Sequence, residues 1–158
     1  GNGTLGWFFG FKLHIIINDK GEILNFVITQ GNTDDRQPLY SKEFTQSVFG
    51  KLFGDRGYIS QKLQEFLFVD GIQLITKMRN NMKGGEIPLK DKLILRKRAV
   101  IESVNDELKN ICQIEHTRHR SFTNFITNLI AGLLAYSFLP KKPSINVDFI
   151  DQDQLALF

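Results

Sequence analysis

A hairpin pattern near the start of the chain is the feature that most restricts the fold. Residues 7–18 (WFFGFKLHIIIN) and 22–29 (EILNFVIT) are rich in aromatic and β-branched side chains, which is typical of strands. The segment between them, NDKG, supplies turn chemistry, because Gly21 can adopt a positive φ at no steric cost. The pattern predicts two long antiparallel strands joined by a tight turn.

Strand and helix patterns alternate after this hairpin, which favours an α/β fold. We expect a mixed sheet with helices on both faces. The 158 residues are 42% hydrophobic and 23% charged, which suits one domain with a substantial core. We expect this domain to span residues 1–139 and to be followed by a weakly ordered tail, 140–158. The expected strands are 50–54 and 72–76, and the expected helices are 38–48, 60–71, 95–112 and 121–139.

The helix expected over residues 95–112 (LRKRAVIESVNDELKNIC) separates into two faces at about 100° per residue. An apolar stripe runs along one side of it, fit to pack on a sheet. A polar cluster on the flank of the stripe holds the Glu102 carboxylate between two cations. This pattern suggests a metal-bound carboxylate beside a phosphate backbone. The stripe consists of Val100, Ile101, Val104, Leu108, Ile111 and Cys112, and the cluster of Arg98, Glu102, Asn105 and Lys109.

Asp55 directly follows the short strand 50–54. Sites in α/β sheets form at the carboxyl ends of strands, although an ordinary turn aspartate is the simpler interpretation of this residue alone. We expect Asp55 and Glu102 to converge. Paired carboxylates without a Cys or His ligand set favour Mg²⁺ or Mn²⁺. Two such ions can activate a water or a 3′-hydroxyl for phosphoryl transfer on nucleic acid.

Three groups of polar residues are open to more than one interpretation. Lys12 and His14 project from the same face of a strand, either into solvent or into a groove that holds phosphate. Adjacent Asp34 and Asp35 are explained more simply as helix caps than as metal ligands. Arg118, within the basic RHR segment that follows Cys112, is better suited to phosphate or carboxylate than to a zinc site, because no second cysteine exists.

Charge, cysteine content and apolar runs restrict the class of protein only weakly. A net charge of +3 and a pI near 9.0 are compatible with a polyanionic partner but do not require one. A single cysteine provides no disulfide framework and suits a reducing compartment. The first residues do not show the pattern of a secretory signal, which is a charged start followed by an apolar run and a small-residue cleavage site. The run 121–139 approaches the length of a membrane span, but polar residues interrupt it, so we expect a buried helix.

Five sequence blocks carry a family resemblance. GWFFGFKLHIIINDKGEIL, GNTDDR, KLFGDRGYIS, QLITKMRNNMK and RKRAVIESVNDELKNICQIEHTRHRS resemble the catalytic domain of bacterial insertion-sequence transposases of the DDE type. The resemblance extends from about residue 6 to residue 143. It implies a ribonuclease-H-like fold, two Mg²⁺ ions held by an Asp, Asp, Glu triad, and cleavage and strand transfer at transposon ends.

The resemblance implies specific roles for individual residues. Asp55 matches the second acid of the triad and Glu102 the third. The family signature in the last block is Tyr, two residues, Arg, three residues, Glu, six residues, Lys. Arg98, Glu102 and Lys109 fit this spacing, whereas Leu95 stands in the tyrosine position, which removes a DNA-contacting hydroxyl. Because Arg98 and Lys109 match the basic positions of this signature, the resemblance implies that they contact DNA.

The first acid of the triad is expected on a strand that precedes Trp7. The resemblance thus implies a carboxyl-terminal fragment that lacks this strand, and two alternatives stay open. The chain is either a catalytic domain that needs the missing strand, or a catalytically inactive DNA-binding remnant. Another ribonuclease-H-like nuclease is less favoured. Expected partners are double-stranded DNA and a second copy on paired ends, in the bacterial cytoplasm at the nucleoid, with no membrane.

Overall fold

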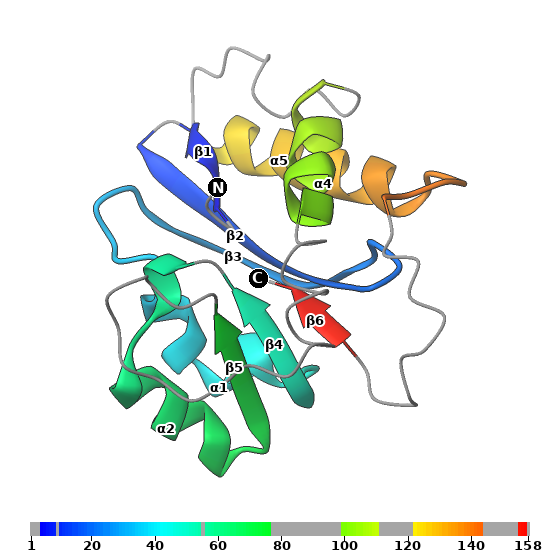
Figure 1. Ribbon diagram of the computed structural model, residues 1–158. Coiled ribbons are helices and arrows are strands. Elements are labelled where there is room, and N and C mark those ends of the chain that lie inside the picture. Colours follow the sequence, from blue (N-terminus) through cyan, green and yellow to red (C-terminus); the bar gives the residue numbers. More distant parts are fainter. Residues whose placement is uncertain are drawn as a thin grey trace.

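A six-stranded mixed sheet forms the centre of the molecule in the computed structural model, which describes residues 4–8, 10–54, 56–76, 99–110, 122–143 and 155–157. β6, β4 and β5 follow one edge of β2 in that order, β1 pairs with another part of the same edge, and β3 pairs with the opposite edge (Figure 1). The strands are β1 (Thr4–Phe8), β2 (Phe11–Asn18), β3 (Ile23–Gln30), β4 (Gly50–Gly54), β5 (Ile72–Thr76) and β6 (Leu155–Leu157). The helices are η1 (Gln37–Tyr40), α1 (Lys42–Thr45), η2 (Arg56–Tyr58), α2 (Gln61–Val69), α4 (Ala99–Asn110) and α5 (Phe122–Ser137).

The predicted hairpin is confirmed as β2 and β3, which pair antiparallel from Phe11 to Ile17. Its turn is held by the Asn18 carboxamide oxygen, which accepts hydrogen bonds from two backbone N–H groups of the turn. Gly21 has a φ of 75°. The prediction of one continuous strand over 7–18 is wrong, because the chain reverses at Gly10 (φ 81°) and β1 folds back onto β2. An aromatic run on both sides of a glycine does not reveal such a reversal.

The parallel half of the sheet follows the predictions closely. β4 and β5 have the expected bounds and pair parallel along their full length, with α2 as the crossover. The Ser60 hydroxyl accepts a hydrogen bond from the Leu63 backbone N–H and caps α2, as N-cap serines commonly do. The apolar pattern of residues 60–71 predicts that Val69 faces inward, which is wrong: Val69 is the last residue of α2 and its side chain is 83% exposed.

The single helix predicted over 38–48 is wrong. The chain instead forms η1 and α1, two short turns separated by Ser41, whose backbone is extended (φ −86°, ψ 115°). The Ser41 hydroxyl accepts a hydrogen bond from the Phe44 N–H and so begins a new helix. The helical spacing of this segment predicts that Leu39, Tyr40, Phe44 and Val48 face inward. Leu39, Phe44 and Val48 are buried and Tyr40 is half-buried, so the spacing predicted the inward side but not the interruption.

Helices cover both faces of the sheet, as predicted. Alternate residues of β2 contribute to two cores, with Leu13, Ile15 and Ile17 on one face and Ile16 on the other. Burying a side chain of this size contributes roughly 1.5–3 kcal/mol, so β2 is a major source of the stability of both cores. The first core includes α4 and α5, and the second includes η1, α1 and α2 (Figure 1).

α5 buries one face and exposes the other. Phe125, Leu129, Leu133 and Tyr136 are buried, and the Tyr136 hydroxyl donates a hydrogen bond to the Gly21 carbonyl. The opposite face exposes Ile130 and Leu134, and Phe138 is exposed directly after the helix, so the expectation of a buried helix holds for one face only. Among the residues that the structure describes, no helix combines the length and apolar character needed to cross a membrane.

The segment expected as a weakly ordered tail, 140–158, contributes a strand. Leu155–Leu157 forms β6, which pairs antiparallel with β2 and parallel with β4. Three residues are too few for a periodic pattern, and the two edges that β6 joins come from distant parts of the sequence. The strand therefore has no local signal that could have indicated it.

Candidate functional site

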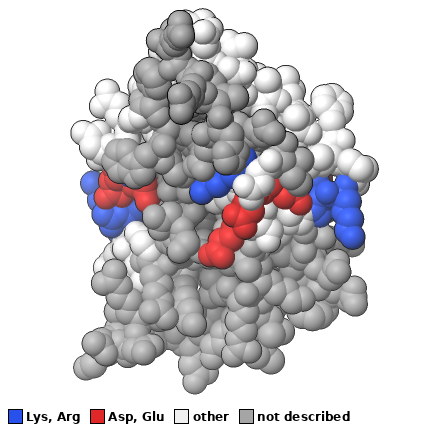
Figure 2. Space-filling view, turned by 90° about the horizontal axis from the view of Figure 1, so that it is seen from above, with Lys and Arg blue, Asp and Glu red and all other residues white. Residues whose placement is uncertain are grey.

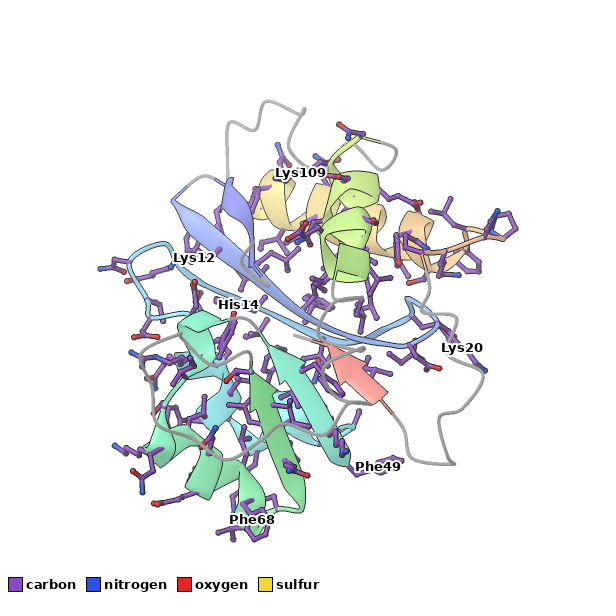
Figure 3. All side chains as sticks on the ribbon, viewed as in Figure 1. Lys12, His14, Lys20, Phe49, Phe68 and Lys109 are labelled. Carbon is purple, nitrogen blue, oxygen red and sulfur yellow. The ribbon has the colours of Figure 1, made fainter. Side chains whose placement is uncertain are left out.

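α4 presents the predicted apolar stripe and the predicted acid on different sides. Val100, Ile101 and Val104 are buried, whereas Glu102, between them in sequence, is exposed. Lys109 is half-buried and lies about two turns further along the same side. Figure 3 labels Lys109 on this helix. Arg98, the other cation of the predicted cluster, lies outside the described residues, as does Arg118.

Asn105 adds an unusual polar group to this flank of α4. Its side chain is only 8% exposed, and the carboxamide oxygen has no hydrogen-bond partner among the residues that the structure describes. Leaving a buried acceptor unsatisfied costs about 1–3 kcal/mol. Asn105 follows Glu102 by three positions, which places both on neighbouring turns of one helix flank. The flank therefore offers an exposed carboxylate and a buried carboxamide oxygen.

Asp55 lies between β4 and η2 and is itself outside the described residues. The chain on either side of it is firmly packed. Tyr58 is 1% exposed, and a Cβ built on Gly54 would lie 3.2 Å from the Tyr58 ring. The aromatic ring thus occupies the space that any larger residue at position 54 would need. η2 therefore packs against the end of β4, on the two sides of position 55 in the sequence.

The end of β4 and the start of α4 share one core. Phe53, two residues before Asp55, is fully buried in the cluster that also contains Ile101 and Val104. Ile101 directly precedes Glu102. The backbones that carry the two predicted acids are therefore anchored in the same apolar cluster. The convergence of the two carboxylates themselves stays a prediction, because Asp55 is not described.

Lys12 and His14 lie two positions apart on β2 (Figure 3), where the Lys12 side chain is half-buried and the His14 ring is fully buried. The Lys12 ammonium donates to the Asp35 carboxylate at 2.9 Å and to the Thr33 carbonyl at 2.8 Å. His14 is fully buried, and its Nε2 lies 2.7 Å from the Thr29 hydroxyl. The interpretation of a solvated face is wrong for His14. Its burial also leaves no surface for a direct phosphate contact in this structure.

Electrostatics in this region follow from burial and from close ion pairs. Burial lowers the pKa of His14 to about 4; the nearby Asp35 opposes this shift and Lys12 adds to it. The ring is therefore neutral at pH 7. Hydrogen bonds from Arg36 lower the pKa of Asp34 to about 2. Asp34 accepts from the Arg36 backbone N–H, which is an Asx turn, so the expectation that these aspartates cap a helix is wrong.

The described residues contain no group of three His, Cys, Asp or Glu side chains that could hold a metal ion. The donors available on α4 are oxygens, which suits Mg²⁺ or Mn²⁺ better than softer metals. Figure 2, seen from above, shows acidic and basic side chains next to each other on one face, among residues that are not described. The exposed acids of α4 are Glu102 and Asp106.

Sequence reasoning missed the partners that hold Lys12 and His14. Thr29 pairs with Lys12 in the hairpin register, which makes it a diagonal neighbour of His14 on the same face, so a correct register could have indicated this contact. Asp35 approaches β2 from the loop after β3 and carries no such signal. Asn105 was placed on the polar flank correctly, but its burial depends on the packing of α4 and could not be read from helical periodicity.

Comparison with known proteins identifies one family. A model of the transposase DDE domain matches residues 1–122, about three quarters of the chain. The matched range contains β1 to β5 and α4, and therefore both Asp55 and Glu102. Neither the curated proteins nor the solved structures give a match.

Proposed function

The chain belongs to the transposase DDE-domain family, and from this premise we propose that it acts in DNA transposition by metal-dependent phosphodiester cleavage and strand transfer at insertion-sequence ends. The observation that carries the proposal is the position of Glu102. Its carboxylate is exposed on α4, directly after Ile101, which shares a core with Phe53 near the end of β4. This arrangement supports the assignment of Asp55 and Glu102 as a catalytic pair.

Asp55 and Glu102 would hold Mg²⁺ or Mn²⁺, with two ions expected in the complete site. The oxygen donors of the described flank fit such a cation, and the unsatisfied Asn105 oxygen lies on the same side of α4 as Glu102. When bound, the metal activates a water or a 3′-hydroxyl and stabilises the leaving oxygen. The protein would contribute by holding both carboxylates next to residues anchored in one core, so that little reorganisation would be needed.

DNA contacts would come from cations around this site. Lys109 lies about two turns beyond Glu102 on α4, and Arg98 lies four positions before it in sequence; together with Arg118 they would hold the phosphate backbone. Lys12 could reach a phosphate only by leaving Asp35 and the Thr33 carbonyl. We therefore propose that Lys12 and His14 support the DNA-binding face through the loop after β3.

The order of the strands supports a ribonuclease-H-like form of the mixed sheet. An antiparallel hairpin is followed by two parallel strands with a helical crossover, and helices cover both faces. We propose that residues 1–139 act as the catalytic domain. DNA substrates, a homodimer on paired ends and a location at the bacterial nucleoid accompany this proposal as consequences of the family.

A second candidate is a DNA-binding remnant that does not cleave. Within the described residues, Glu102 belongs to no group of three His, Cys, Asp or Glu side chains that could hold a metal ion, and its polar neighbour on the flank is the Asn105 carboxamide. A domain of this kind would bind DNA through Lys109 and its neighbours without completing a metal site. The two candidates differ in cleavage, not in DNA binding.

Nicking of supercoiled plasmid DNA in Mg²⁺ or Mn²⁺ tests the proposal. We compare the unmodified chain with Glu102→Gln, and with Asp106→Asn as a matched control, because Asp106 is also exposed on α4. Glu102→Gln should abolish nicking and leave DNA binding intact, whereas Asp106→Asn should retain both. Nicking by the Glu102 variant at the unmodified rate would contradict the assignment. Binding without nicking by the unmodified chain would favour the remnant.

A further inference from the structure

The shortest strand of the sheet lies at its centre. β6 has three residues, yet it pairs with β2 on one side and with β4 on the other (Figure 1). Within the described residues, it is the strand that connects the antiparallel part of the sheet to the parallel part. The three residues pair with Ile17 and Asn18 of β2 and with Lys51, Leu52 and Phe53 of β4.

β6 and β1 share one edge of β2. The other edge of β2 pairs with β3 over the β2 residues Phe11 to Ile17. A strand has only two hydrogen-bonding edges. On the shared edge, β1 pairs with Phe11 to His14, and β6 pairs with Ile17 and Asn18. Both run antiparallel to β2, so they lie in line with each other along this edge.

The register along the shared edge of β2 shows that a longer β1 and β6 would compete for the same position, Ile17. Thr4 pairs with His14 and Leu5 with Leu13. A β1 that continued in this register toward the amino terminus would bring position 1 opposite Ile17, which is the residue that Leu157 pairs with. A longer β1 and the present β6 therefore exclude each other at Ile17.

We propose that the slot between β2 and β4 is a binding site for one extended peptide segment, and that the chain's own carboxyl-terminal strand is an exchangeable occupant of it. Recognition is by main-chain hydrogen bonds on both sides, the mode by which sheets accept an added strand. A three-residue occupant makes few such bonds, so a longer or tethered segment can replace it. This inference does not depend on the proposed activity.

The first test is a disulfide across the proposed contact. Lys51 and Leu155 are paired neighbours on β4 and β6, and adjacent strands are close enough for a disulfide. In a Cys112→Ser background, Lys51→Cys with Leu155→Cys should cross-link within one chain on oxidation. The control is Gln73→Cys with Leu155→Cys, since Gln73 pairs with Lys51 from the far side and lies one strand further away.

The second test is exchange of the occupant. Ala156→Pro removes a backbone donor from the middle of β6, and Ala156→Ser keeps that donor as a control. A fluorescent peptide of the last six residues, DQLALF, should bind the proline variant at least tenfold more tightly than the serine variant. Amide exchange at Ile17 and Leu52 should be faster in the proline variant, and the peptide should restore protection.

Either test can overturn the inference. Cross-linking that occurs only between two chains, or equally in the Gln73 control, would contradict occupancy by the chain's own strand. Equal peptide binding by the two Ala156 variants would contradict exchange. If Ala156→Pro fails to fold, deletion of residues 155–158 takes its place in the same titration. The disulfide result decides occupancy in any case, because neither of its substitutions interrupts the backbone of β6.

Discussion

Acid should destabilise this protein through the buried imidazole of His14. The ring is fully buried beside Thr29, and burial lowers its pKa from 6.5 to about 4. The unfolded chain therefore binds a proton more readily than the folded one between these values. The free energy of unfolding is at its full value above pH 6.5 and falls as the pH drops toward 4.

The size of the effect follows from the shift. A difference of one pKa unit corresponds to about 1.4 kcal/mol, so protonation of His14 alone lowers the free energy of unfolding by roughly 2–3 kcal/mol between pH 7 and pH 4.5. This is a large part of the stability of an ordinary domain, about 5–15 kcal/mol. Nearby Lys12 adds to the cost of a charged ring, and Asp35 reduces it.

Urea unfolding at pH 7 and pH 4.5 measures this loss. The comparison variant is His14→Gln, which keeps an amide group able to bond Thr29 but cannot titrate. His116 and His119 are retained in both proteins, so their contributions cancel. We expect the unmodified chain to lose roughly 2–3 kcal/mol more than the variant over this range. Equal losses in the two proteins would refute the argument that His14 is held neutral by burial.

Other predictions concern stability and DNA binding. Lys12→Met removes a partly buried ion pair and should lower the free energy of unfolding in urea by about 1–2 kcal/mol, whereas Arg36→Met, which breaks an exposed pair, should cost below about 0.5 kcal/mol. Gly54→Ala forces the Tyr58 ring to move and should cost about 1–3 kcal/mol in the same assay. Lys109→Ala should weaken DNA binding and reduce its salt dependence by about one phosphate contact, measured by anisotropy across a salt series. An unchanged salt slope would remove Lys109 from the interface.

The parts of the fold that sequence predicted are those with local signals. The hairpin has a turn motif between two β-branched runs, and α2 has Ser60 at one end and Gly71 (φ 77°) just past the other. α4 has an unbroken apolar stripe. In each case the residues that determine the element lie within it or next to it, so the pattern is sufficient.

The parts that sequence missed depend on distant contacts. β6 exists because β2 and β4 leave a slot of the right width, and no property of Leu-Ala-Leu indicates this. His14 is fully buried with its ring beside Thr29 of β3, and Asp35 reaches Lys12 from the loop after β3. Helical and strand periodicity place a side chain on a face, but they do not show what covers that face.

The candidate site was predictable to the same degree. The spacing of Arg98, Glu102 and Lys109 follows a signature in the sequence, and Glu102 is exposed on α4, but the roles of these residues stay predictions. The unsatisfied oxygen of Asn105 was not predictable, because its burial results from the way α4 packs on the sheet. The meeting of Asp55 and Glu102 depends on the whole fold and stays a proposal.

Binding of Mn²⁺, followed by electron paramagnetic resonance in the presence of DNA, tests the central claim most directly. We propose that Glu102 and Asp55 are ligands of the catalytic metal. Glu102→Gln and Asp55→Asn should each weaken Mn²⁺ binding at least tenfold, whereas Asp106→Asn should leave it unchanged. Equal Mn²⁺ affinity in the unmodified chain and in the Glu102 and Asp55 variants would contradict the assignment of the metal site.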